Sequence, residues 1–223
     1  MKKSVQLTSR TIAVCGHATL GWGGFLLSIL LLGGCAALPD RPVRPAVFDF
    51  GPGLATQPVT AATQTLPPLL LADIEAPAAV DGTAVLFRLA YADVQQLRPY
   101  AHARWSMPPA QLVRQRLRDQ LSLERVVLSP AEGPASLVLR LELEEFTQVF
   151  ETPERSVGLV RMRATLLESA GGRERLVAQR RFTAQRPAPS PDAPGGVRAL
   201  TAATDAAVEE IAQWLKQAQP ATR

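Results

Sequence analysis

Few side chains in this 223-residue sequence carry the chemistry of catalysis or metal binding. The two cysteines, Cys15 and Cys35, lie in the first 35 residues, and the two histidines are His17 and His102. A thiolate can form a disulfide, bind a soft metal or act as a nucleophile. Because no cysteine follows Cys35, a domain built from the later residues holds no disulfide and no thiolate metal site. The residues around the two cysteines must therefore indicate what chemistry their thiols have.

The residues before Cys35 have the organisation of a secretory signal peptide. The first 34 residues contain three basic side chains and no acidic one, and an apolar run covers residues 25–32. The run ends in Leu32-Gly33-Gly34-Cys35, which resembles the bacterial lipobox of leucine, two small residues and cysteine. In that motif the thiol receives a diacylglyceryl group, a peptidase cuts before the cysteine, and the new amino group is acylated. The sequence thus predicts a signal peptide over residues 1–34 and lipidation of Cys35.

Lipidation would make the protein a permanent resident of a membrane. Each CH₂ group buried in the bilayer contributes about 0.8 kcal/mol to membrane binding. One acyl chain binds a protein only marginally, whereas two or three chains anchor it stably. Residue 36 is Ala rather than Asp, which by the lipoprotein sorting pattern favours the periplasmic face of the outer membrane. The alternative is an uncleaved transmembrane helix, because residues 11–39 are uncharged and long enough to span a bilayer. Six glycines in that stretch argue against it, and Cys15 is expected to be removed with the signal peptide.

The charge of the chain does not point to a nucleic-acid partner. The formal charge is +4, and Lys2, Lys3 and Arg10 supply +3 of it. The remainder has 21 basic and 20 acidic residues, a balance of +1. Because the pI of about 9.6 reflects the signal peptide and no basic cluster follows it, no nucleic acid is expected to bind.

A change of composition separates a tether from a domain. Residues 35–66 are rich in Pro, Ala and Thr, which predicts a semi-extended tether that carries the lipidated cysteine. Within it, residues 46–51 form an apolar island, either a short strand or a docking segment. The domain is predicted to cover residues 67–223.

Alternating apolar and polar residues predict several strands in this domain. Pro99 makes its own strand an edge or an irregular one, and a slip of the alternation near Glu145 indicates a β-bulge. Outward-facing Glu142 and Glu144 are expected to face Arg161 and Arg163 across the ladder. The predicted strands cover residues 69–74, 84–91, 94–100, 123–128, 136–150, 157–168 and 176–186.

Two segments have helical spacing of apolar residues. The first begins at Pro108-Pro109, buries Leu112, Val113, Leu117 and Leu121, and presents Arg114, Arg116 and Arg118 as a solvated face. The second covers residues 197–217 after a Pro/Gly-rich loop at 187–196, with Trp214 at the edge of its apolar stripe. The expected fold is a single α+β domain, an antiparallel β-sheet packed against two amphipathic helices.

Two short stretches resemble a known family. They are Arg88-Leu-Ala-Tyr-Ala-Asp93 and Arg104-Trp-Ser-Met-Pro-Pro-Ala-Gln-Leu-Val113, and they resemble the ABC-type transport auxiliary lipoprotein component family, the PqiC-like group. The resemblance covers nearly all of the chain after Cys35, and Arg104-Trp105 is its sharpest motif. The Met-Pro-Pro start of the helix departs from the family, which usually has an acidic residue before a single proline.

The resemblance implies a role in transport and no chemistry. Members of the family accompany ABC transporters whose periplasmic MCE (MlaD-like) subunits move lipids between the inner and outer membranes. By this resemblance the protein is a non-enzymatic adaptor whose partner is an MCE subunit. The resemblance is also compatible with a homo-oligomer of this chain.

The Arg104-Trp105 pair has two interpretations. Tryptophan and arginine are enriched at interface hot spots, which makes the pair a candidate partner interface. In the other interpretation, favoured for Trp105, the indole packs under the first helix and Arg104 makes local pairs.

No catalytic constellation accompanies these features. His102 is the one histidine expected to remain after cleavage, and it lies in a predicted loop without a recognisable nucleophile motif or phosphate-binding glycine loop. No catalytic residue, cofactor or metal is therefore expected. Two other hypotheses remain: an outer-membrane assembly lipoprotein that acts as a β-barrel partner or plug, and a periplasmic hydrolase that depends on His102.

Overall fold

The computed structural model describes residues 43–53 and 66–218, all within a compact unit that begins at Val43. The predicted signal peptide, Cys35 and the larger part of the predicted tether lie outside the described residues. The elements in chain order are β1 (Ala46–Phe48), β2 (Leu66–Leu71), β3 (Ala84–Leu89), β4 (Asp93–Trp105), α2 (Pro109–Leu121), β5 (Arg125–Leu128), β6 (Leu137–Phe150), β7 (Ser156–Ala170), β8 (Arg173–Pro187) and α3 (Ala193–Ala218).

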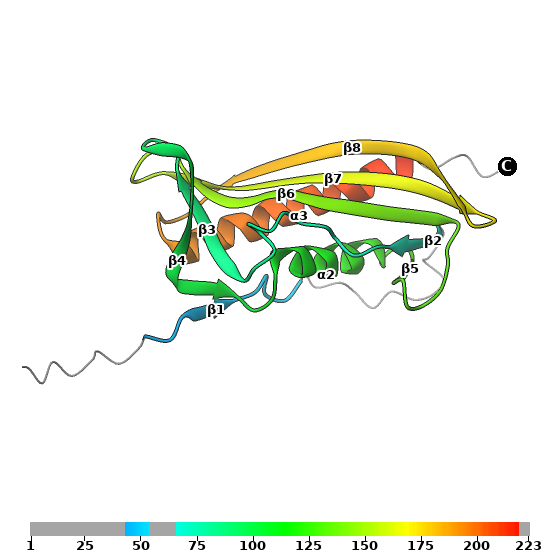
Figure 1. Cartoon of the computed structure of the whole chain (residues 1–223), viewed down its shortest axis with the longest axis horizontal. Helices are drawn as coiled ribbons and strands as arrows, with labels where there is room; N and C mark the ends of the chain where they lie inside the picture. Colours follow the sequence, from blue (N-terminus) through cyan, green and yellow to red (C-terminus); the bar gives the residue numbers. More distant parts are fainter. Residues whose placement is uncertain (1–42, 54–65, 219–223) are drawn as a thin grey trace, which may run out of the picture. The chain divides into compact units, whose positions relative to one another are not determined.

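The strands form one mixed sheet organised around β6 (Figure 1). The three long strands β6, β7 and β8 are antiparallel neighbours. On its other side β6 is shared by two strands: β2 lies beside its first residues and β3 beside its last. β5 continues the sheet from β2, while β4 and then β1 continue it from β3.

The expectation of a purely antiparallel sheet is wrong, although the α+β class with two helices is confirmed. The pairings β1–β4, β2–β5, β2–β6 and β3–β6 are parallel. Parallel neighbours need a long crossover connection. Here α2 carries the chain between β4 and β5, so the strands that follow it return parallel to strands that precede it.

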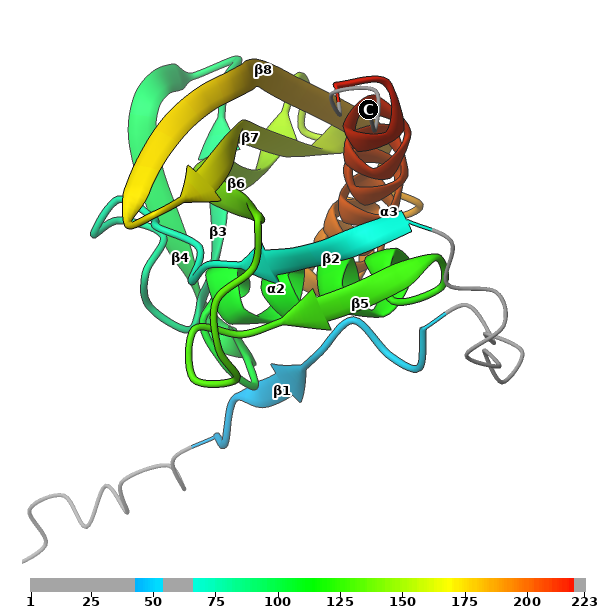
Figure 2. The ribbon, with the colours of Figure 1, turned by 90° about the vertical axis from the view of Figure 1, so that its right-hand side faces the viewer.

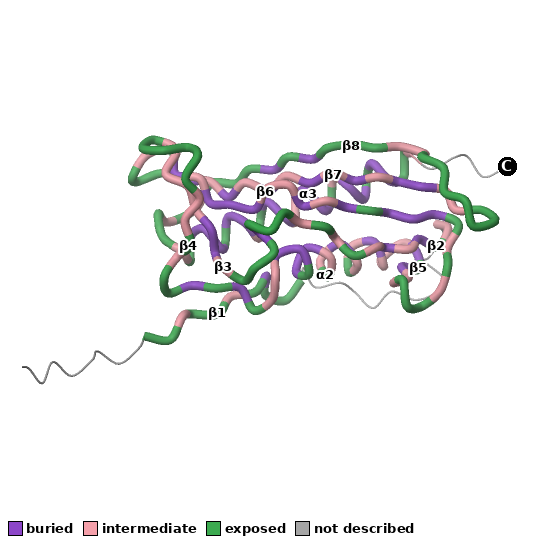
Figure 3. The backbone as a smooth tube through the Cα atoms, in the orientation of Figure 1, coloured by how far each residue is buried: buried purple, intermediate pink, exposed green. Residues whose placement is uncertain are grey.

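The curved sheet encloses the helices, and α3 covers the inner face of its long strands (Figure 2). Val160, Met162, Ala164 and Leu166 alternate inward from β7 and are fully buried. They meet the apolar stripe of α3, which is buried as predicted: Leu200, Ala203, Ala207, Val208, Ile211 and Leu215. In Figure 3 the buried core follows β6, β7 and α3, whereas β8 is largely exposed.

Close approach of α3 to β7 requires a glycine. A Cβ at Gly158 would lie 2.5 Å from the backbone carbon of Ala199, which is closer than real carbon contacts. At the other end of the helix, Trp214 is 8% exposed and its ring centroid lies 5.6 Å from that of Phe182, so it occupies the predicted core edge.

Helix α3 begins four residues before the predicted start, inside the predicted loop. Asp192 precedes the helix, and its Oδ1 accepts a hydrogen bond of 2.7 Å from the backbone N–H of Gly195, as an N-cap does. Pro194 is tolerated because the first turn has no use for its missing N–H. Gly196 packs directly against the side chain of Gln148, so the glycines mark a close contact here and no loop.

Several local expectations about the strands are confirmed. The register of β6 with β7 shifts between Leu143 and Glu145, at the predicted bulge. Arg163 pairs with both Glu142 (3.2 Å) and Glu144, whereas Arg161 lies opposite Glu145. Strand β4 is irregular at Pro99, since its register with β3 jumps between Arg104 and Pro99.

Candidate functional site

The first described segment of the chain packs against the end of β4 and against both helices. We call residues 46–53, which comprise β1 and the five residues after it, the strap. β1 pairs in parallel with the end of β4, and Val47 lies opposite Arg104. The backbone N–H of Ser106 adds a hydrogen bond of 2.7 Å to the carbonyl oxygen of Phe48. The apolar island is therefore both a short strand and a docking segment.

Phe50 fixes the strap to the core. Its side chain is 8% exposed, and its ring centroid lies 5.7 Å from that of Trp105, in an edge-to-face arrangement, and 6.1 Å from that of Phe146. Trp105 and Phe146 are themselves 5.6 Å apart. Edge-to-face pairs contribute beyond the area that they bury, so the three rings form an aromatic cluster that holds the strap by one side chain.

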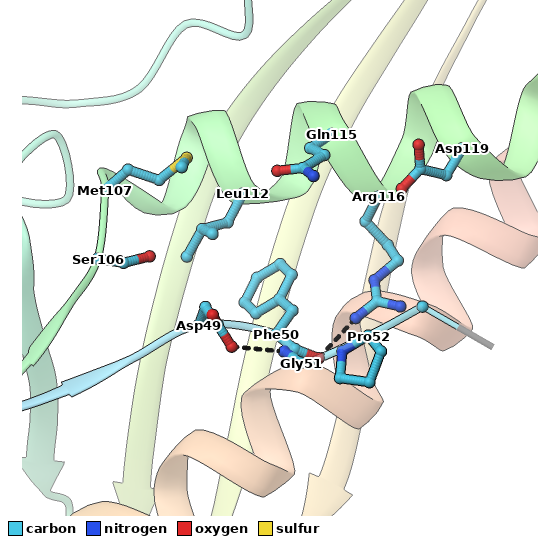
Figure 4. Close-up of a pocket in the computed structure, with 11 residues that line it drawn as sticks. Asp49, Phe50, Gly51, Pro52, Ser106, Met107, Leu112, Gln115, Arg116 and Asp119 are labelled. Atoms are coloured by element: carbon cyan, nitrogen blue, oxygen red, sulfur yellow. Dashed lines mark hydrogen bonds between the residues drawn. The ribbon is translucent and has the colours of Figure 1, made fainter. Parts of the chain in front are cut away.

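Arg116 of α2 holds the strap from the outside (Figure 4). Its Nη2 donates a hydrogen bond of 2.7 Å to the carbonyl oxygen of Phe50, and its Nε lies 3.3 Å from Oδ1 of Asp205 on α3. The Arg116 side chain is only 12% exposed, so its assignment to a solvated face is wrong. Burial raises the pKa of Asp205 above its usual value of 3.8, and the positive charge of Arg116 opposes this rise.

A tight turn follows Phe50 and directs the chain along α2. Oδ1 of Asp49 accepts a hydrogen bond of 2.7 Å from the backbone N–H of Gly51. Gly51 has a φ of 67°, a conformation in which a side chain would be strained. Figure 4 shows this turn below the Arg116 guanidinium.

The strap has a pocket on each side. On the α2 side it leaves a pocket of about 220 Å³, lined by Met107, Leu112, Gln115, Arg116 and Asp119 among others. On the α3 side it leaves a more open one of about 410 Å³. The first volume is below the roughly 300–1,000 Å³ of typical ligand sites. No histidine or cysteine lines either pocket within the part of the chain that the structure describes.

The residues of the predicted partner interface have different positions. Trp105 is 1% exposed and belongs to the aromatic cluster, which favours its structural interpretation. Its Nε1 finds no hydrogen-bond acceptor among the described residues. Arg104 and His102 are exposed on β4. Arg104 is thus accessible to a partner, and its role in an interface stays a prediction, as does lipidation of Cys35 outside the described residues.

Arg88, in the first stretch of the family resemblance, stabilises the β3–β4 hairpin. Its Nη1 donates hydrogen bonds to the carbonyl oxygens of Val94 (3.3 Å) and Gln95 (3.2 Å). Its Nη2 lies 3.5 Å from Oε1 of Glu145 at the β6 bulge. This arginine links the hairpin to the bulge and has a structural role.

A second buried polar group lies beside the start of α3. Gln148 is completely buried and accepts a hydrogen bond of 2.8 Å from the Tyr100 hydroxyl at its Oε1. Its Nε2 donates one of 2.7 Å to Oγ of Ser156. Burial raises the pKa of Tyr100 to about 12, so the phenol stays protonated and keeps its role as donor.

Residues 43–53 and 66–218 offer neither a metal site nor a membrane-spanning helix. Their His, Cys, Asp and Glu side chains form no group of three that could hold a metal ion. No helix among them combines the length and hydropathy needed to cross a membrane.

Sequence reasoning missed the contacts that dock the strap. The apolar island in a Pro-rich stretch was a usable sign for Phe50. For the Arg116–Asp205 pair there was no sign, because each residue lies on the polar side of its own helical pattern and the two are far apart in the sequence.

The fold occurs in solved structures of low sequence identity. The protein XCC0632 from Xanthomonas campestris superimposes with a TM-score of 0.65 at 20% identity, over 78% of this chain and 96% of its own. An uncharacterized protein superimposes with a TM-score of 0.60 at 16% identity, over 77% of this chain and 99% of its own. These likenesses show a shared fold. Among curated proteins no match was found.

The family of the chain follows from its sequence. The family model of the ABC-type transport auxiliary lipoprotein component matches residues 50–212. The chain belongs to this family, as the Arg88 and Arg104-Trp105 stretches indicated. The match begins at Phe50, the strap residue in the core, and ends within α3. Membership makes the protein a lipoprotein component of an ABC-type transport system in the cell envelope.

Proposed function

We propose that this protein is a non-enzymatic adaptor of an ABC/MCE-type lipid transport system that links the inner and outer membranes. In this role acyl chains on Cys35 hold it at the periplasmic face of the outer membrane, and an MCE (MlaD-like) subunit is its protein partner. The match of residues 50–212 to the auxiliary lipoprotein family carries the proposal, and the Leu32–Cys35 motif supports the anchor.

The architecture suits an adaptor because the strap, which follows Cys35 closely in the sequence, is packed against the core. Displacement of the strap would pull Phe50 from its aromatic cluster and break the contacts of Arg116. The docked strap therefore fixes the point at which a tether from Cys35 meets the sheet and helices. An adaptor needs such an attachment point and a binding surface, and it needs no catalytic group.

Cross-linking in intact cells followed by affinity purification tests the proposed partner. We expect an MCE subunit, with its ABC transporter, among the trapped proteins. Recovery of a β-barrel protein in place of any MCE protein would support the assembly-lipoprotein alternative and refute the adaptor.

Metabolic labelling with palmitate tests the anchor separately. The wild-type chain should incorporate the label and fractionate with the outer membrane. Cys35→Ala should lose both properties, whereas Cys15→Ala, a matched control in the predicted signal peptide, should keep them. Labelling of Cys35→Ala would refute the lipidation site.

A further inference from the structure

The docked strap makes the tether much shorter than the composition suggests. From Cys35 to the domain start predicted from sequence at Pro67 there are more than thirty residues, with a reach of about 100–110 Å at roughly 3.3–3.6 Å per residue. Because β1 begins at Ala46, only ten residues lie between Cys35 and the first strand, which makes eleven Cα–Cα steps. Their reach is at most about 36–40 Å. The domain end that carries β1 must therefore stay near the membrane that holds Cys35.

The surface at that end is apolar and basic. Val43 and Val47 are 66% and 53% exposed, two of the six most exposed large apolar side chains of the described residues. Arg44 is exposed beside them, and Arg104 and His102 are exposed on the adjoining part of β4. Residues 94–105 contain two arginines, one histidine and no acid. Asp49 is the single acidic residue of the strap.

This combination fits the surface of an anionic bilayer. Valine side chains gain by entering the boundary between headgroups and acyl chains, and arginine binds lipid phosphate through paired N–H donors. We propose that Val43, Arg44, Val47, His102 and Arg104, which we call the β1 face, rest on the membrane that holds the anchor. The proposal depends on the proposed lipidation of Cys35. For Arg104 it names the bilayer as the partner in place of a protein.

A fluorescent probe on the β1 face tests the contact. After removal of the signal peptide the one cysteine is Cys35, whose thiol is expected to carry lipid, so an introduced cysteine is a unique labelling site. Full-length acylated Val47→Cys is labelled with an environment-sensitive dye and reconstituted into vesicles of phosphatidylethanolamine and phosphatidylglycerol. The matched control is Thr183→Cys, an exposed residue of β8, which lies on the opposite side of the molecule from β1 in both views (Figures 1 and 2).

We expect spin-labelled lipids to quench the dye at position 47 and to leave the dye at position 183 unaffected. Equal quenching at the two positions would overturn the membrane contact of the β1 face. Absence of quenching at position 47, in protein that incorporates palmitate, would do the same. Either result would leave the proposed function unaffected. Protein that fails to incorporate palmitate would overturn the anchor, and the β1 face with it. The palmitate label therefore separates the two failures.

Charge reversal tests the chemistry of the contact. One arginine near an anionic surface strengthens binding by about five-fold. Arg44→Glu should therefore lower the ratio of membrane-bound to free orientations at least about five-fold in the quenching assay. The control is Arg173→Glu at the exposed start of β8, which should change it less than two-fold, and unfolding midpoints should show that both variants fold. Equal effects of the two substitutions would contradict the proposal.

Discussion

Replacement of Phe50 by alanine probes how the strap is held against the rest of the domain. The ring is 8% exposed and contacts Trp105 and Phe146 edge-on or tilted. Apart from this ring, the strap is held by three residue pairs with β4, by the Ser106 hydrogen bond to the Phe48 carbonyl and by the Arg116 hydrogen bond to the Phe50 carbonyl. The side chain is thus the largest single contribution to strap docking that the structure shows.

The expected loss follows from the cost of emptying an aromatic site. Phe→Ala in a core costs about 3–5 kcal/mol, and more where the surroundings cannot relax. Beside Phe50 lies an open pocket of about 220 Å³, through which water can enter the vacated space. We therefore expect the low end of the range, about 3 kcal/mol. Most of it should appear as release of the strap, because the sheet and helices keep their other contacts.

Hydrogen exchange of the strap amides measures this release. A loss of about 3 kcal/mol corresponds to roughly 150-fold faster exchange if the amides exchange through local opening. Urea unfolding of the same variant gives the effect on the whole domain. The control is Val47→Ala, which is 53% exposed and should change stability by no more than about 0.5 kcal/mol. If Phe50→Ala and Val47→Ala exchanged at the same rate, the strap would not depend on the aromatic cluster.

Three further substitutions test other parts of the structure. Arg116→Met keeps an apolar stem but removes the hydrogen bond to the Phe50 carbonyl and the cation beside Asp205, whose pKa burial already raises. It should cost about 1–3 kcal/mol in urea unfolding at neutral pH; an unchanged midpoint would contradict this. Hydrogen bonds from Ser190 and from the backbone of Gly195 hold the pKa of Asp192 below its usual 3.8, so its carboxylate stabilises the fold above that pH and loses this effect as the pH falls. Asp192→Asn keeps a capping oxygen but does not titrate. In acid titration the stability of this variant should therefore fall less than that of the wild type below about pH 4. Equal losses of stability in the two proteins would refute the stabilising role of the Asp192 carboxylate. Gly158→Ala should cost about 1–3 kcal/mol through its contact with α3, whereas Gly82→Ala, which has open space, should be neutral in the same thermal melts.

Local patterns accounted for much of the secondary structure. The apolar face of α2 and the stripe of α3 lie where helical periodicity places them. The slip of alternation near Glu145 is a real bulge, and Glu142 and Glu144 do pair with Arg163. These features depend on neighbours within one element or across one hairpin, so a short stretch of sequence is enough to predict them.

The order of the strands in the sheet and the direction of their pairing cannot be predicted from any short stretch of sequence. β2 and β3 share one side of β6 because α2 crosses between the two halves of the chain, and alternation is the same in parallel and antiparallel strands. The start of α3 was missed for a similar reason. Gly196 is required by the side chain of Gln148 on β6, and Gly195 by the backbone of Ser190 before the helix, whereas the two glycines by themselves resemble a loop.

The sequence by itself determined the predicted lipidation site, the helices and most strands, and the motifs of the family, because each is a local pattern or a short string of residues. Only the tertiary structure decided that Phe50 enters the core, that Arg116 is largely covered and contacts Asp205 and the strap, and that Trp105 packs against Phe50. Those contacts join segments far apart in the chain, and their burial depends on what packs above them. The length of the tether follows from the same contacts, since it ends where the chain first docks.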